Sequence, residues 1–214
     1  MPRLREILRL PIYEKINCLW VAYFLIKTDF FYRHIFGSMG SHCMIRKPVS
    51  LYNTRYIHLG DRVSIGTGVR LDAIVDKPSR APELRIGNNV NIEQNVHIIC
   101  HSRIRIGNNV SITGHCAIVD TTHPYQDVHD PRPIGARILD EDSYVEIGDG
   151  SFLGFGAIVL PNVRIGKHCV VGANSCVTND IPDYSVVAGN PAVVVRRYDA
   201  VTGTWIRPAA TLSE

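Results

Sequence analysis

A histidine–proline pair, His123 and Pro124, stands where an otherwise regular sequence loses its rhythm. On both sides of this point an aliphatic residue returns every six positions, but between His123 and Glu146 it does not. Proline has no N–H to donate to a β-ladder, so a strand that reaches Pro124 must end there. Histidine, with a reference pKa of about 6.5, is the side chain best suited to accept a proton near neutral pH. The sequence therefore predicts a loop over residues 124–146 with a candidate general base, His123, at its start.

Three other histidines lie upstream in a short stretch and raise a second kind of chemistry. His97, His101 and His115 could ligate zinc, which takes imidazole nitrogens in tetrahedral sites. The cysteines give less support for a metal site, since the six of them form no C-x-x-C pair and show no disulfide framework. We interpret the cysteines as small buried residues of a protein from a reducing, cytoplasmic compartment.

Length and charge limit the classes of partner. The 214 residues, 45% of them hydrophobic, suffice for one domain with a continuous core and small appendages. The formal net charge of +3 is not gathered into a stripe of lysine and arginine interleaved with aromatic residues. The sequence therefore argues against a nucleic-acid partner and favours a small phosphorylated ligand.

The regular part of the sequence is a six-residue repeat that must position these residues. In "IGNNVNIEQNVHI" aliphatic residues recur at Ile86, Ile92 and Ile98, and the same frame runs without a slip from Ile147 to Val177. A glycine often follows the aliphatic residue, and the fifth position is small or β-branched. This period fits neither a helix nor an alternating strand, but it fits short strands joined by tight corners, with three hexads to a coil. The repeat predicts an all-β parallel β-helix over residues 45–197.

The two ends of the chain lie outside the repeat. Residues 1–44 are predicted to form a helical extension, with helical spacing of apolar residues over 3–36. The longest apolar run, Ile16–Ile26, is shorter than the roughly 20 residues that a membrane-spanning helix needs. We expect this helix either to cap the β-helix core or to lie on a membrane surface as a basic amphipathic anchor. The tail, residues 198–214, shows no repeat and is expected to be loosely packed.

The His-Pro pair and the C-terminal pattern together resemble a known family. The stretch "IGDGSFLGFGAIVLPNVRIGKHCVVGANSCVTNDIPDYSVVAGNPAVVVR" is similar almost throughout to the closing pattern of the hexapeptide-repeat acyltransferases, and most of all to sugar and polysaccharide O-acetyltransferases. The resemblance implies a left-handed parallel β-helix, acetyl-CoA as acyl donor without a metal, and a homotrimer with its ligand site between subunits. It also implies a sugar or glycan acceptor and a role in the assembly of bacterial surface polysaccharide.

The resemblance carries residue roles over to this sequence as expectations. It implies that His123 is the general base that takes the proton of a sugar hydroxyl, and Asn95 matches an asparagine that contacts the acceptor sugar. The backbone N–H of Phe155 matches the donor to the thioester oxygen, a role that does not depend on the side chain. The positions that match contacts to coenzyme A are Ala173, Thr178, Arg196 and, as an assisting cation, Lys167.

Several of these residues also fit a purely structural role. Asn95 fits an asparagine stacked at a β-helix corner, and Lys167 fits a solvated surface charge. The family often has serine at position 155, and the larger Phe155 of this sequence would narrow the pantetheine channel. Asn179 stands where the family commonly has lysine, which weakens the case for phosphate binding there.

Alternatives to sugar O-acetylation stay open. An N-acetyltransferase of an amino sugar nucleotide would use the same base and coenzyme. A γ-carbonic-anhydrase-like enzyme would need zinc held by histidines, but that family places two of them five apart, and Asp120 stands five after His115. A non-enzymatic β-helix subunit is the third alternative. The hydrogen-bond acceptor that orients the His123 ring is also undecided: it could be Asp120, another carboxylate in the loop or a backbone carbonyl.

Overall fold

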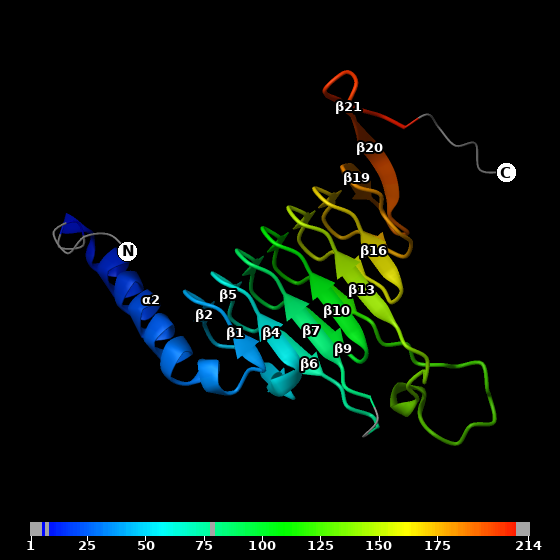
Figure 1. The fold of residues 1–214 in the computed structure, drawn as a ribbon, viewed down its shortest axis with the longest axis horizontal. Helices are drawn as coiled ribbons and strands as arrows, with labels where there is room; N and C mark the ends of the chain where they lie inside the picture. Colours follow the sequence, from blue (N-terminus) through cyan, green and yellow to red (C-terminus); the bar gives the residue numbers. More distant parts are fainter. Residues whose placement is uncertain (1–5, 7–8, 78–79, 209–214) are drawn as a thin grey trace.

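The computed structural model describes residues 6, 9–77 and 80–208, and its body is a parallel β-helix with three faces (Figure 1). Sheet A consists of β1 (Ser38–Met39), β4 (Ile57–Leu59), β7 (Glu83–Ile86), β10 (Arg103–Ile106), β13 (Tyr144–Ile147) and β16 (Val163–Ile165). Sheet B begins with β2 (Met44–Ile45), β5 (Ser64–Ile65), β8 (Asn91–Ile92), β11 (Ser111–Ile112), β14 (Phe152–Leu153), β17 (Val170–Val171) and β19 (Ser185–Ala188). Sheet C consists of β3 (Ser50–Tyr52), β6 (Arg70–Ala73), β9 (His97–Cys100), β12 (Ala117–Val119), β15 (Ile158–Val159) and β18 (Cys176–Val177).

The core is a set of stacked aliphatic columns, one for each face. Ile86 pairs with Ile106, and Ile106 pairs with Ile147, so the first residue of each hexad lies directly above its counterpart in the previous coil. All three side chains are at most 3% exposed. Burial of such residues is the main favourable term in folding, at roughly 25 cal/mol for each Å² of apolar surface. The six-residue repeat therefore encodes the fold through burial, as the sequence predicted.

Each coil passes from sheet A to B to C, so the β-helix has an A–B corner, a B–C corner and a C–A corner. The third residue of most corners has a positive φ, for example Asn109 with φ 55° and Asn174 with φ 55°. Asparagine tolerates this left-handed conformation better than most residues. The glycines that begin the corners are needed for close stacking, since a Cβ on Gly87 would lie 2.7 Å from the backbone of Gly107.

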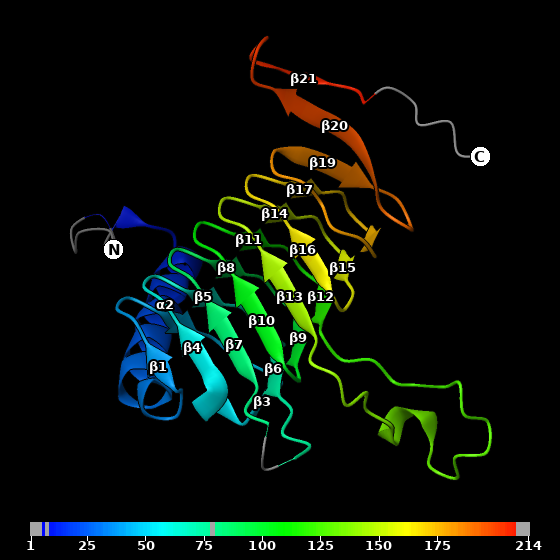
Figure 2. The ribbon, with the colours of Figure 1, turned by 45° about the vertical axis from the view of Figure 1, so that its right-hand side comes forward.

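Two excursions leave the β-helix, both from the C–A corner. The first lies between β6 and β7, where residues 74–77 and 80–82 are described, and the second covers residues 120–143, between β12 and β13. The second projects away from the body of the molecule and carries a short 3-10 helix, η3 (Ile134–Ala136) (Figure 2). The coil between them turns this corner through His101 and Ser102 alone, so the two excursions lie one coil apart.

The long N-terminal helix covers part of the predicted span 3–36, and the described residues Glu6 and Arg9 before it are also helical. The long helix is α2 (Ile12–Phe30), followed by the 3-10 helix η1 (Tyr32–His34), and the parallel ladder already begins at Ser38. Residues 3–5 and 7–8 of the predicted helix over 3–36 lie outside the described residues. The buried Thr28 hydroxyl accepts the N–H of Ile45 at 2.8 Å, which fixes α2 against β2. No helix in the described part of the chain is long and apolar enough to cross a membrane.

The C-terminal segment forms an arm instead of a wholly loose tail. Strand β20 (Val193–Asp199) runs antiparallel to β19, and β21 (Thr204–Ile206) folds back on β20 as a hairpin. The rings of Tyr198 and Trp205 pack edge to face with centroids 5.6 Å apart. The expectation of a loosely packed segment over 198–214 missed this hairpin, because no repeat marks it, and residues 209–214 lie outside the described chain.

Candidate active site

His123 lies at the start of the second excursion, where β12 has ended and the chain leaves the C–A corner. Its side chain is exposed, and its Nδ1 lies 2.8 Å from the backbone carbonyl oxygen of Arg137. A carbonyl oxygen can only accept a hydrogen bond, so Nδ1 carries the proton in this contact. Nε2 of the neutral imidazole then keeps its lone pair and faces outward from this contact, as a general base requires.

The carboxylate of Asp120 has a different task. It is buried and accepts the N–H groups of His101 at 2.6 Å, Ser102 at 2.9 Å and Arg103 at 2.7 Å. Burial raises the pKa of Asp120, while these three backbone N–H groups oppose the rise. Of the alternatives left open for the partner of His123, the geometry selects a backbone carbonyl, and Asp120 instead fixes the C–A corner below the loop.

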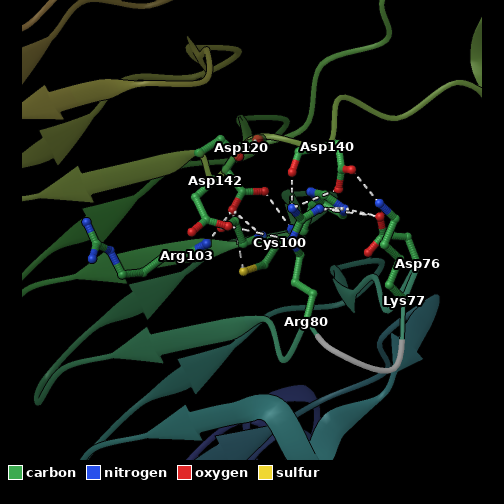
Figure 3. Close-up of polar contacts among 11 residues, drawn as sticks. Asp76, Lys77, Arg80, Cys100, Arg103, Asp120, Asp140 and Asp142 are labelled. Atoms are coloured by element: carbon green, nitrogen blue, oxygen red, sulfur yellow. Dashed lines mark hydrogen bonds and ion pairs between the residues drawn. The ribbon is translucent and has the colours of Figure 1, made fainter.

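A group of charged residues joins the two excursions at the base of the second one (Figure 3). Arg80 of the first excursion donates to the backbone carbonyl of Asp140, and it lies 3.3 Å from carboxylate oxygens of both Asp140 and Asp76. Lys77 contacts the Asp140 carboxylate at 2.5 Å. His101, which is 1% exposed, lies 3.1 Å from Asp76. The excursion that carries His123 is therefore tied to the first excursion as well as to its own coil.

The B–C corner gathers a second set of the predicted residues. Asn95 places its amide nitrogen 3.2 Å from Nε2 of His115, and the His115 ring lies 5.0 Å from the ring of Phe155. Asn95 has φ 56°, so it is also a corner asparagine of the structural kind. Asn95 and His115 line a surface hollow of about 390 Å³, together with His97 and Ala117.

The backbone of this corner presents N–H donors that the fold does not use, among them those of Phe155 and Ala173. Phe155 and Ala173 occupy equivalent positions in successive coils, and Asn174 donates its N–H to the Phe155 carbonyl at 2.8 Å. The N–H groups of Gly154 and Gly156, on either side of Phe155, are both bonded. Among the described residues we find no acceptor for the N–H of Phe155 or of Ala173. Both groups can therefore donate to a ligand, which is the chemistry expected of an oxyanion hole and of a thioester-binding strip.

The remaining predicted coenzyme residues lie elsewhere in the same chain. Thr178 follows β18 at the C–A corner, on the same edge of the β-helix as the excursion of His123. Lys167 lies at the A–B corner, where its N–H donates to Asp183 at 2.8 Å. Arg196 is exposed on the arm strand β20, opposite Val186. A single chain thus brings Asn95 together with the Phe155 corner, but it does not bring His123 there.

The histidines considered as zinc ligands do not converge. His97 and His115 line the hollow at the B–C corner, whereas His101 lies at the C–A corner with Asp76 and Arg80. Within residues 9–77 and 80–208, no group of three or more His, Cys, Asp or Glu side chains is arranged to hold a metal ion.

The outer face of sheet A carries a separate groove of about 610 Å³. Most of the charged side chains on this face form ion pairs with one another. Glu83 pairs with Arg85 at 2.7 Å and with Arg105 at 3.0 Å. Arg164 likewise pairs with Glu146 at 2.8 Å. Lys167 lines this groove, but His123, Asn95 and the Phe155 corner do not. We therefore take the corners as the candidate site and regard this groove as a solvated face.

Arg137 is the site residue that sequence reasoning missed. It is 8% exposed, and it supplies the carbonyl that holds His123. The sequence shows only an arginine in a polar, proline-rich loop, and neither its burial nor its backbone contact follows from the six-residue repeat. One local feature distinguishes Arg137 from the exposed Arg132: the three residues before Arg137, Ile134–Ala136, are uncharged.

Comparison with known sequences places the chain in a family. The model of the bacterial transferase hexapeptide family (six repeats) matches residues 144–179. The chain is 34% identical over 167 residues to the provisionally named lipopolysaccharide biosynthesis O-acetyl transferase WbbJ of Escherichia coli (strain K12), which covers 76% of this chain and 82% of WbbJ. It is also 34% identical over 170 residues to the galactoside O-acetyltransferase of Lactococcus lactis, which covers 77% of this chain and 65% of that enzyme.

Solved structures agree on the fold. AntD, an N-acyltransferase from Bacillus cereus in complex with dTDP and 3-hydroxybutyryl-CoA, superposes with a TM-score of 0.68 at 19% identity, over 82% of this chain and 90% of AntD. At this identity the likeness concerns the fold alone, a left-handed parallel β-helix. The identity to WbbJ over most of both chains concerns the family. The chain belongs to the bacterial hexapeptide-repeat acyltransferases.

Proposed function

We propose that this protein is an acetyl-CoA-dependent O-acetyltransferase that modifies a sugar hydroxyl in bacterial surface polysaccharide, with His123 as the general base. The observation that carries the proposal is the contact of His123 Nδ1 with the Arg137 carbonyl at 2.8 Å, which leaves Nε2 free to take a proton. The names of WbbJ and of the Lactococcus galactoside O-acetyltransferase support an O-linked sugar acceptor.

The proposed reaction is a direct transfer without a covalent enzyme intermediate. Nε2 of His123 takes the proton of the sugar hydroxyl as its oxygen attacks the thioester carbonyl carbon. The resulting oxyanion accepts the free N–H of Phe155, which holds the negative charge in place. The carbon–sulfur bond then breaks, the acetyl ester forms, and the leaving thiolate of coenzyme A recovers the proton from the imidazolium. Ala173, Thr178 and Arg196 would bind the coenzyme, with Lys167 as an assisting cation.

This proposal requires a second copy of the chain, because His123 and the Phe155 corner lie on different edges of one β-helix. We propose a homotrimer in which the C–A corner of one copy faces the B–C corner of its neighbour. Sheet C lies between these two edges, and Ile158 on its outer face is 39% exposed. Asn95 would contact the acceptor across the same interface. Sedimentation is expected to give three chains, and a fully active monomer would contradict the arrangement.

Peripheral membrane contact is part of the same proposal. One side of α2 exposes large apolar residues, among them Leu19 at 70%, Ile26 at 60% and Phe30 at 79%. Basic side chains accompany them, since Lys47 lies 5.3 Å from the ring of Trp20. Such a face suits an interfacial helix near lipid-linked acceptors. Flotation with vesicles that contain anionic lipid is the test, and a chain that stays entirely at the bottom of the gradient would contradict membrane contact.

The test of the transfer reaction is thiol release from acetyl-CoA over a panel of sugars, amino sugar nucleotides and bacterial glycans. With an O-acceptor, His123→Ala is expected to lower kcat/KM by about 100-fold or more. His123→Asn serves as the size-matched control. Acetylation of only the amino sugar nucleotides would replace the O-acetyl proposal by its N-acetyl alternative. An unchanged rate in both variants would remove His123 from the mechanism.

A further inference from the structure

The guanidinium of Arg137 holds the apex of the second excursion together. Its Nη1 donates to the carbonyl of Asp127 at 2.9 Å and its Nη2 to the carbonyl of Asp130 at 2.8 Å. Nε and Nη2 both donate to the carbonyl of Arg132, at 2.9 Å and 2.8 Å. Four hydrogen bonds from one planar group thus bring three carbonyls of an otherwise irregular loop to a single point.

The burial of this cation gives the arrangement its rigidity. The side chain of Arg137 is 9% exposed, and its nearest counter-ion is Asp130, with Nε and Oδ2 3.6 Å apart. A buried guanidinium that lost its carbonyl partners would be desolvated without compensation, so the loop apex and the side chain stabilise each other. The neighbouring arginine differs, because Arg132 pairs with Asp130 in solvent, with its side chain 64% exposed.

The backbone of the same residue reaches His123. The Arg137 carbonyl accepts the Nδ1 proton of His123, and two residues later the N–H of Leu139 donates to the carbonyl of Thr122 at 3.1 Å. The 3-10 helix η3 positions Arg137, since the N–H of Arg137 donates to the carbonyl of Ile134 at 3.0 Å. The side chain therefore fixes the loop on one side of residue 137, and the carbonyl fixes the histidine on the other.

We propose that Arg137 is a positioning residue of the acyl transfer, which sets the tautomer and the direction of the His123 ring through its own backbone carbonyl. This rests on the proposed role of His123 as the base. Arg137 acts through His123 and touches neither acceptor nor thioester. Misplacement of a reacting group by about 1 Å can cost a rate factor of about 100, so a loosened loop is expected to show itself in kcat.

The experiment compares Arg137→Gln and Arg137→Lys with the matched control Arg132→Gln, which removes an exposed charge from the same loop and leaves the carbonyls in place. We expect Arg137→Gln to lower kcat by about 10- to 100-fold with the KM for acetyl-CoA unchanged within about twofold. Arg137→Lys should be intermediate, because a lysine ammonium cannot span three carbonyls as a fork does. Arg132→Gln should stay within about twofold of the native rate.

Two further measurements separate positioning from a merely structural effect. In the His123→Ala background, Arg137→Gln should lower the residual rate by less than about twofold, because residues that act as one unit are not additive. Nitrogen NMR of the ¹⁵N-histidine-labelled native trimer should show His123 protonated at Nδ1, and Arg137→Gln should show a mixture of both tautomers.

The outcomes distinguish this inference from the proposed function. Equal kcat values for Arg137→Gln and Arg132→Gln would overturn it, as would an undiminished effect of Arg137→Gln in the His123→Ala background. A native rate in His123→Ala itself would instead overturn the base assignment. In that case the NMR measurement still decides whether Arg137 sets the tautomer, and an unchanged tautomer in Arg137→Gln would refute it.

Discussion

Two corners of the same β-helix treat the same backbone group in opposite ways. At the A–B corner, the N–H of Asp61 donates to the side chain of Asn88 at 2.8 Å, and the N–H of Asn88 donates to Asn108 at 2.8 Å. The N–H of Asn108 donates in turn to Asp149 at 2.7 Å. At the B–C corner, the equivalent N–H groups of Phe155 and Ala173 have no acceptor among the described residues.

The difference lies in one side chain per coil. At most A–B corners the residue in the next coil is Asn or Asp, whose oxygen caps the N–H below it; the exception is Lys167, which lies above Asp149. At the B–C corner the residue above Phe155 is Ala173, which has no such oxygen. Capping satisfies the backbone and adds stability, whereas an open N–H costs stability and is retained where a ligand uses it. The A–B corner is therefore capped mostly by its own side chains, whereas the corner proposed to bind the thioester keeps the N–H groups of Phe155 and Ala173 open.

Removal of the open donor should have the largest effect on activity. Phe155→Pro deletes the N–H, and the backbone accommodates proline, since Pro161 occupies the equivalent position at the C–A corner before Asn162. We expect kcat to fall by about 100- to 1,000-fold, as for loss of an oxyanion-hole donor. Phe155→Ala keeps the N–H and should retain most of the rate. Thr67→Pro, at the same corner three coils earlier, is the control for the backbone change, and equal losses in both proline variants would contradict the assignment.

A side-chain acceptor introduced for the Phe155 N–H should also lower activity, but by less. Ala173→Asn places an amide oxygen where the A–B corner has its caps, and it is expected to accept the Phe155 N–H. Activity should fall by about 10-fold because the ligand must displace this contact, and unfolding should cost about 0.5–1 kcal/mol more. Steady-state kinetics and denaturant titration measure the two changes. A loss of both activity and stability would mean that the asparagine does not cap.

Opening the capped corner should affect stability alone. Asn108→Ala removes the acceptor of the Asn88 N–H, and the free energy of unfolding is expected to fall by about 1 kcal/mol. The rate of acetyl transfer should remain within about twofold. Loss of activity at native stability would show that the A–B corner takes part in the chemistry and would break the comparison.

The smallest effect is expected from acid at the A–B corner. Hydrogen bonds from the backbone N–H and the hydroxyl of Ser41 hold the pKa of Asp61 below its usual 3.8. A lowered pKa in the folded state adds stability above the unfolded value, and this contribution is lost as pH falls below about 3.8. Asp61→Asn keeps the cap, as the native Asn88 does, so its melting temperature should depend less on pH between 5 and 3. Identical pH dependence in both proteins would contradict this.

The sequence was most informative where one rule repeats. Burial of an aliphatic residue every sixth position defines the coil, so Ile86, Ile106 and Ile147 were placed correctly from spacing alone. The His-Pro pair marked the excursion but not its bounds, because β12 already ends at Val119, before Pro124, and β13 begins at Tyr144, before the predicted end at Glu146. Contacts within the excursion follow no repeat, and the link from Arg137 to His123 spans 14 residues of irregular loop. The arm was missed likewise, because β20 pairs with β19 by antiparallel hydrogen bonds that carry no six-residue signal.

The excursion that carries His123 does not change the parallel pairing of the strands before and after it. Asn88 and Asn108 are 20 residues apart and Asn108 and Asp149 are 41 apart, yet the two caps have the same geometry within 0.1 Å. The coil closes over the insertion as though it were absent, and β13 stacks on β10 in full register. The excursion can therefore behave as an exchangeable cassette. A loop of different length or composition, grafted between β12 and β13 with Asp120, His123 and the carbonyl contact of His123 retained, should fold on this scaffold. Such a graft is expected to change the acceptor while the proposed coenzyme corner stays the same.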